Sequence, residues 1–152
     1  MDIQALEEIS LSLRRDVVEM VYRTKDGHPS PSFSVADIIT ALYFEVMRLD
    51  PSNPDWEDRD RFVLSKGHSC PVLYAALAKK GYFPREELFT LRYLNSHLQG
   101  HPYAPKTKGL DATTGSLGNG VSIGLGMAWL PGFARKHTKS MPSPETGNWG
   151  RA

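Results

Sequence analysis

Several common features are scarce or missing in this sequence of 152 residues. It has a single cysteine, Cys70, which excludes an internal disulfide framework and is typical of a reducing compartment. It contains neither a run of about 18 apolar residues nor a basic leader followed by an apolar core. Lys plus Arg number 18 against 17 Asp plus Glu, so no excess of positive charge indicates a nucleic-acid partner. We therefore expect a soluble cytoplasmic protein that binds neither membranes nor nucleic acids.

The first third of the chain predicts two helices joined by a turn. Apolar residues recur at the three-to-four spacing of one helix face from Ile3 to Val21, which is typical of an amphipathic helix. The following GHPSPS segment predicts a turn stiffened by its two prolines. Ser34, with Asp37 three residues later, predicts the N-cap of a second helix that continues through Val46.

The middle of the chain predicts a strand, two helices and a long loop. The apolar segment RFVLS follows the polar loop 50–60 and precedes a glycine, which favours a buried strand. An apolar helix face comes next and is closed by Gly81. A shorter helix is expected from Pro84 to Tyr93, with proline in its first turn. Residues 95–114 predict a loop, and a loop of about 20 residues is usually functional or disordered.

Glycines are concentrated in the segment TTGSLGNGVSIGLGMAWLPG. Each glycine costs about 1 kcal/mol relative to alanine in an exposed helix interior, so the segment predicts a core helix that a neighbour or a ligand approaches closely at its first turn. The spacing of GNGVSIG also imitates a dinucleotide fingerprint. No strand precedes it and the downstream acidic residue is missing, which argues against a Rossmann site.

Three Gly-His pairs stand at the ends of expected elements: Gly27-His28, Gly67-His68 and Gly100-His101. Helix N-termini offer free backbone N–H groups and a partial positive charge, which suit a phosphate. A neighbouring imidazole can donate a hydrogen bond to the same anion or transfer a proton. The pattern predicts that these turns, with the glycine-rich turn 113–120, converge on one anionic ligand.

A metal site is an alternative interpretation of the same residues. His97 and His101 are four residues apart, and His68 with Cys70 would complete a set of four zinc ligands. The glycine and proline on either side of His101 argue against a regular helix there, so the helical spacing required for this site is in question.

Four motifs resemble, in order and spacing, the amino-terminal thiamine diphosphate-binding region of transketolase. They are DGHPSPSFSVADIITALYF, DRFVLSKGHSCPVLYAALAKKGYF, LQGHP and TTGSLGNGVSIGLGMA. The resemblance covers about Leu6 to Ala128. It implies an α/β fold in which this chain forms an incomplete, helix-rich part of a parallel sheet flanked by helices.

The resemblance also implies roles for six residues. His28 and His101 would be catalytic and would bind the substrate, His28 near the reacting carbon and His101 beside the hydroxyls and the cofactor. The cofactor-binding residues would be His68 at the diphosphate, with Gly115, Ser116 and Leu117 at the aminopyrimidine and the diphosphate.

The implied reaction is transfer of a two-carbon ketol unit from a ketose phosphate to an aldose phosphate, with thiamine diphosphate and Mg²⁺. In the family, a Gly-Asp-Gly strand and a later asparagine hold the metal ion. Neither occurs after Ala128, so no metal ligand is assigned in this chain. The resemblance therefore implies sugar-phosphate substrates and a partner that completes the site. That partner would be a carboxy-terminal transketolase subunit or another copy of the chain.

We expect residues 1–130 to form the partial cofactor-binding domain and residues 131–152 to form an atypical, disordered tail, because the tail is proline-containing and poor in apolar residues. We expect the isolated chain to be inactive. Two alternatives remain open from the sequence: a non-catalytic product of truncation or a frameshift, and a small zinc-binding module.

Overall fold

The computed structural model describes residues 1–129 and 140–142. In chain order the elements are α1 (Ile3–Thr24), α2 (Pro29–Phe33), α3 (Ala36–Ala41), the π-helical turn η1 (Leu42–Val46), β1 (Arg61–Val63), the 3₁₀ turn η2 (Gly67–Ser69), α4 (Cys70–Lys80), the 3₁₀ helix η3 (Arg85–Thr90), α5 (Asn119–Trp129) and β2 (Ser140–Pro142). None of the helices in these described ranges combines the length and apolar character needed to cross a membrane.

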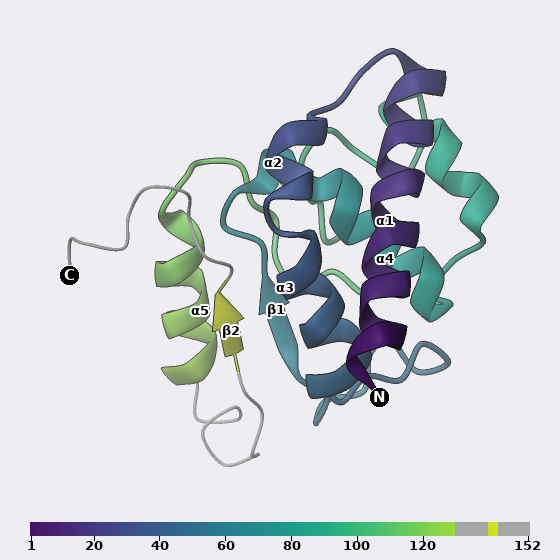
Figure 1. The fold of residues 1–152 in the computed structure, drawn as a ribbon. Coiled ribbons are helices and arrows are strands. Elements are labelled where there is room, and N and C mark those ends of the chain that lie inside the picture. The colour runs from purple at the N-terminus through teal and green to yellow at the C-terminus, as the bar shows by residue number, and fades with distance from the viewer. Residues whose placement is uncertain (130–139, 143–152) are drawn as a thin grey trace.

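Helix α4 is the centre of the hydrophobic core. All of its residues from Cys70 to Ala78 are buried, and α1, α2, α3 and η3 pack around it (Figure 1). Pro71 occupies the first turn, where its missing N–H would have no helical partner. Gly81 ends the helix in the left-handed region, with φ of 98°. The predicted apolar helix and its end at Gly81 are confirmed.

Helix α1 lies across this core and presents one buried face to it. Its buried apolar residues are Leu13, Val17 and Met20, at the spacing that the sequence predicts. The side chain of Asp2 caps the helix by accepting the N–H of Ala5 at 2.7 Å. The predicted helix is confirmed, although the apolar face does not reach its first turn.

The segment after α1 differs from the prediction in two ways. Pro29 opens the short helix α2, where a turn was expected, because the fixed φ of proline suits the first helical position. Ser34 does not cap α3; the N-cap position is Val35, which makes no side-chain cap. The Ser34 hydroxyl donates to the Pro31 carbonyl at 2.9 Å and accepts from Lys66 Nζ at 2.6 Å. The hydroxyl therefore joins α2 to the segment that follows β1.

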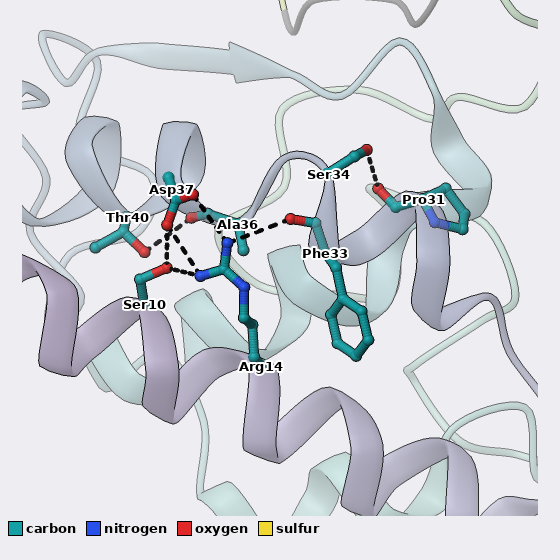
Figure 2. A network of polar contacts seen from close by, with 8 residues as sticks. All are labelled: Ser10, Arg14, Pro31, Phe33, Ser34, Ala36, Asp37 and Thr40. Carbon is teal, nitrogen blue, oxygen red and sulfur yellow. Dashed lines mark hydrogen bonds and ion pairs between the residues drawn. The ribbon is translucent and has the colours of Figure 1, made fainter.

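A network of polar contacts fixes α3 and the end of α2 on α1 (Figure 2). Both oxygens of the Asp37 carboxylate accept from Arg14, each at 2.9 Å. Ser10, which is buried in α1, donates to the same carboxylate at 2.6 Å. Arg14 also donates to the Phe33 carbonyl at 3.5 Å. Arg14 and Ser10 hold the pKa of Asp37 below its usual range, so the carboxylate stays charged. Asp37, expected in a capping role, thus links two helices.

Strand β1 confirms the predicted buried strand, and it pairs with β2 in parallel register. Helix α5 contacts both strands and stands beside the main group of helices in Figure 1. Gly120 of α5 fits against Ser65, whose side chain leaves no room for a Cβ at position 120. The prediction of a core helix here is wrong: only Gly120 and Gly124 are buried. The apolar face of α5, which was expected to be buried, is not covered by any other described residues.

Two further predictions concern the rest of the chain. The helix expected over Pro84–Tyr93 is the shorter 3₁₀ helix η3, with Pro84 at its N-cap. Residues 95–114 form a loop without helix or strand, as expected. Within the predicted tail 131–152, the structure describes only strand β2, and the expectation of disorder for the other tail residues lies outside the described residues.

A buried cluster of charges fixes the end of the long loop to β1. The Asp111 carboxylate pairs with Arg59 Nη2 at 2.7 Å and with Arg61 Nη1 at 3.3 Å. It also accepts the backbone N–H of Phe62 at 2.8 Å. The side chains of Asp111 and Arg59 are only 3% and 5% exposed, so neither charge has full access to water. The loop residue Asp111 is therefore a structural anchor.

Replacing Asp111 with asparagine should destabilise the chain by about 3 kcal/mol, because it leaves the buried Arg59 charge without its counter-charge. Urea unfolding followed by circular dichroism measures the change in the free energy of unfolding. Asp55→Asn, at an exposed position, is the matched control and should be close to neutral. Equal stability of the two variants would contradict the anchoring role.

Candidate functional site

Two of the predicted site histidines meet at the start of α2 and α4. His28 occupies the N-cap position of α2, and His68 lies in η2, which leads into α4. Their rings are in edge-to-face contact, with centroids 5.7 Å apart and an interplanar angle of 75°. The two Gly-His turns, far apart in the sequence, therefore present their imidazoles to the same place.

His101 joins this pair from the long loop. Burial, the positive charge of Arg92 and the proximity of His28 together lower its pKa from the ordinary 6.5. A Cβ at Gly115 would lie 3.9 Å from Cδ2 of the His101 ring, so the glycine-rich turn is in contact distance of the imidazole. The hydroxyl of Tyr74, from the buried helix α4, donates to the His101 carbonyl at 3.2 Å. The third Gly-His pair is thus held beside the first two.

The glycine-rich turn lies against η2 because Gly67 has no side chain. A Cβ built at Gly67 would lie 2.7 Å from the Thr114 carbonyl oxygen and 2.9 Å from its Oγ1. Such distances are shorter than real Cβ contacts, so only glycine permits this approach. Thr114 immediately precedes Gly115, and His68 immediately follows Gly67. The approach therefore brings the predicted cofactor-binding residues of two segments together.

Two buried hydroxyl groups at this junction have no hydrogen-bond partner among the described residues. They belong to Ser69, which is fully buried, and to Thr114, which is 7% exposed. A buried hydroxyl without a partner is costly, and native proteins seldom leave one. The polar oxygens of a bound diphosphate would satisfy such groups, so the residues present fit an anionic cofactor.

The charged groups near the site are mostly basic. Arg92 lies close enough to lower the pKa of His101. Lys66 is buried beside η2, where its Nζ donates to the Pro31 carbonyl at 3.1 Å. Asp26 stands next to the His28 turn and is paired with Arg92 at 2.7 Å. An anionic ligand would therefore meet a favourable local field.

The site is open to solvent in this structure. His28, Gly115, Ser116 and Leu117 are exposed, His101 is largely exposed with a partly buried ring, and His68 is half-buried. All six predicted residues are therefore at least partly accessible. The roles that the resemblance implies for them are treated below as proposals.

The zinc alternative finds no support in the geometry. Within residues 1–129 and 140–142, no three His, Cys, Asp or Glu side chains are grouped as metal ligands. Cys70 is a buried thiol that donates to the carbonyl of Gly100 at 3.3 Å, and burial raises its pKa to about 12. His97 is engaged elsewhere, where it pairs with Glu87 at 2.7 Å.

Four polar residues of the site escaped prediction: Asp26, Ser69, Arg92 and Thr114. Ser69 and Thr114 lie inside quoted motifs, and only their burial without partners singles them out. Arg92 and Asp26 are 66 residues apart in sequence, and their contact depends on the tertiary fold. No local pattern reports such a pair.

Comparison with known proteins identifies a family. The model of the transketolase thiamine diphosphate-binding domain matches residues 6–140. The chain is 49% identical over 116 residues to a 6-deoxy-6-sulfo-D-fructose transketolase subunit of Clostridium sp. (strain MSTE9), covering 76% of this chain and 42% of that protein. It is 44% identical over 128 residues to an apulose-4-phosphate transketolase subunit of Phocaeicola vulgatus, covering 84% of this chain and 45% of that protein.

Solved structures agree with this result. The transketolase of Leishmania mexicana superposes with a TM-score of 0.78 at 37% identity, over 81% of this chain and 18% of that chain. The chain thus spans less than half the length of the two subunits described above and about a fifth of the solved transketolase.

Gly67→Ala should destabilise the chain by about 1–3 kcal/mol, because the new methyl group meets the Thr114 backbone. It should also shift the amide resonances of residues 114–117 in NMR spectra. Gly126→Ala is the matched control: the position is exposed with open space, so alanine should be neutral or stabilising by up to about 1 kcal/mol. A stable Gly67→Ala variant with unchanged spectra would contradict the close approach.

Proposed function

The chain belongs to the transketolase family through its thiamine diphosphate-binding domain, and we propose that it contributes this domain's residues to a site that transfers a two-carbon ketol unit. The donor would be a ketose phosphate and the acceptor an aldose phosphate. The observation that carries the proposal is the meeting of His28, His68 and His101 beside the glycine-rich turn. The names of the two relatives, both transketolase subunits, favour the same chemistry.

In this proposal, His68 and the turn that follows Thr114 hold thiamine diphosphate. The His68 imidazole and the backbone N–H groups at the turn donate to the diphosphate oxygens. The buried hydroxyls of Ser69 and Thr114 gain the partners that they lack among the described residues. Gly115, Ser116 and Leu117 would contact the aminopyrimidine and the diphosphate. When bound, the cofactor supplies a nucleophilic carbon and an electron sink, while the protein supplies orientation.

His28 and His101 would act on the sugar. An imidazole is suited to moving hydroxyl protons because its ordinary pKa is near neutrality. The pKa of His101 is lower than 6.5, so its ring is uncharged at neutral pH and can accept a hydroxyl proton. His28 lies beside His68 and would donate to the carbonyl oxygen of the substrate. Their exposure leaves room for the substrate to approach.

A partner would complete the site. The exposed face of α5 carries Val121, Leu125 and Trp129, which are 53%, 61% and 78% exposed, and an uncharged face of this kind favours association. We infer that a carboxy-terminal transketolase subunit, or another copy of the chain, covers it.

We also propose a larger sheet and a cellular location for the chain. The two-stranded parallel pair of β1 and β2 would be part of a larger parallel sheet flanked by helices, as in a complete domain of the family. The single cysteine, buried and reduced, supports a cytoplasmic location.

His68→Ala should weaken the binding of thiamine diphosphate by about tenfold, because a hydrogen bond to a charged group is lost. NMR titration detects even millimolar affinity and reports each imidazole separately. His97→Ala, a histidine outside the site, is the control and should bind as the wild type does. Thiamine without its diphosphate should bind with equal affinity to the wild type, His68→Ala and His97→Ala. Absence of any change at His68 on addition of thiamine diphosphate would contradict its role.

Ketol transfer tests the activity itself. The isolated chain should give no turnover with xylulose phosphate, ribose phosphate, thiamine diphosphate and Mg²⁺. A hybrid in which residues 6–128 replace the matching segment of the Leishmania mexicana transketolase should be active. His28→Ala in the hybrid should lower kcat by about 10²-fold or more. A folded but inactive hybrid would favour the non-catalytic alternative, and turnover by the isolated chain would contradict the need for a partner.

A further inference from the structure

Arg92 connects two of the segments that meet at the candidate site. Its backbone is left-handed, with φ of 63°, and its N–H donates to the Leu98 carbonyl at 2.8 Å. This bond closes the loop that leads to His101. Its side chain reaches in the other direction, where Nη1 donates to Asp26 Oδ1 at 2.7 Å. Asp26 lies two residues before His28, so one side chain bridges both histidine segments.

The guanidinium group of Arg92 also packs on the backbone beside His101. A Cβ at Gly100 would lie 2.5 Å from Arg92 Nε and 2.8 Å from Cζ. Glycine at position 100 is therefore required for the arginine to lie in this place. The flat guanidinium group thus packs against the Gly100 backbone, and Arg92 holds this segment by contact as well as by its ion pair with Asp26.

The acceptor of this bridge is itself held in place. Asp26 Oδ1 accepts the N–H of Gly27 at 2.7 Å, in addition to the bond from Arg92. The Thr24 hydroxyl donates to the Asp26 carbonyl at 3.1 Å. Arg92, followed by smaller effects of the turn, holds the pKa of Asp26 below its ordinary value. The carboxylate stays ionised at neutral pH, so the bridge is an ion pair.

We propose that Arg92 is a positioning residue, which ties the His28 turn to the His101 loop so that both imidazoles face one ligand. The proposal extends the function proposed above, because it assigns the two histidines to the same site. In this role, Arg92 contacts neither the cofactor nor the substrate. It acts on the histidines through Asp26 and Gly100.

The charge of Arg92 has a second effect on His101. Burial is the largest cause of the lowered pKa of His101; the charged groups that add to it are Arg92 and His28, both of which disfavour a further positive charge. From α4, the Tyr74 hydroxyl and the Cys70 thiol donate to backbone carbonyls of the same loop, and Asp26 is engaged by Arg92. Removing Arg92 should therefore raise the pKa of His101.

The sign of the linked stability follows from this shift. The pKa of His101 is lower in the folded chain than in the unfolded chain, so its contribution is fully present above pH 6.5. The contribution is lost as the pH falls through the folded-state pKa. Without Arg92, the folded-state pKa of His101 moves closer to its unfolded-state pKa. The loss of stability at acidic pH then becomes smaller.

The test is an NMR pH titration of the histidine Cε1–Hε1 signals in the ligand-free chain. Arg92→Gln should raise the pKa of His101 and shift the signals of His28. Arg23→Gln is the matched control, because Arg23 also pairs with a carboxylate, that of Glu19, but on the surface of α1. In this control the His101 and His28 signals should not change.

Two further variants separate position from charge. Gly100→Ala keeps every charge but displaces the guanidinium, so it should also shift the His28 signals. Arg92→Lys keeps the charge without the planar group, so the pKa of His101 should rise less than in Arg92→Gln. Unchanged His28 and His101 signals in folded Arg92→Gln, or in Gly100→Ala if the first variant does not fold, would overturn the proposal. Because the titration uses no ligand, a failure of thiamine diphosphate to bind would contradict the proposed function and leave this result intact.

Discussion

The approach of the Thr114 backbone to Gly67 is the constraint on which the site depends. The carbonyl of Thr114 occupies the space that any side chain at position 67 would take. This approach sets His68 beside the glycine-rich turn and encloses the hydroxyls of Ser69 and Thr114. The buried carboxylate of Asp111 reinforces it, because it fixes the end of the same loop to the N–H of Phe62 in β1. A steric requirement and a buried ion pair thus act on one short stretch of chain.

Electrostatics complements this geometry. Two carboxylates in this part of the chain are already paired with arginines, Asp26 with Arg92 beside His28, and Asp37 with Arg14 between α3 and α1. Their negative charge is therefore largely neutralised locally, and the imidazoles and the helix starts remain to face an anion. Arg14, paired with Asp37, also holds the end of α2 through the Phe33 carbonyl (Figure 2). His28 is the N-cap of that helix. Structural ion pairs in this chain thus prepare a surface for a negatively charged ligand.

The sequence predicts elements whose signal is local. The periodicity of α1, the apolar β1 segment and the end of α4 at Gly81 all follow from neighbouring residues, and the structure confirms them. The cap at Ser34 was wrong because Ser34 finds partners in Pro31 and in Lys66, which is distant in sequence. Three Gly-His pairs identified the histidines of the site, since each pair is a visible motif. Contacts between segments that are distant in sequence, such as that of Arg92 with Asp26, have no local sequence motif.

The error about α5 has a physical cause. An apolar, glycine-rich helix is normally buried, and the pattern of α5 satisfies that rule, yet Leu125 is 61% exposed. The pattern therefore indicates the surroundings for which the helix is suited, and residues 1–129 and 140–142 do not provide all of them. His28 and His101 are exposed at the same time. The described residues thus leave both an apolar helix face and a polar site accessible. Covering the imidazoles would strengthen every interaction between them and a bound anion, because the local dielectric constant would fall.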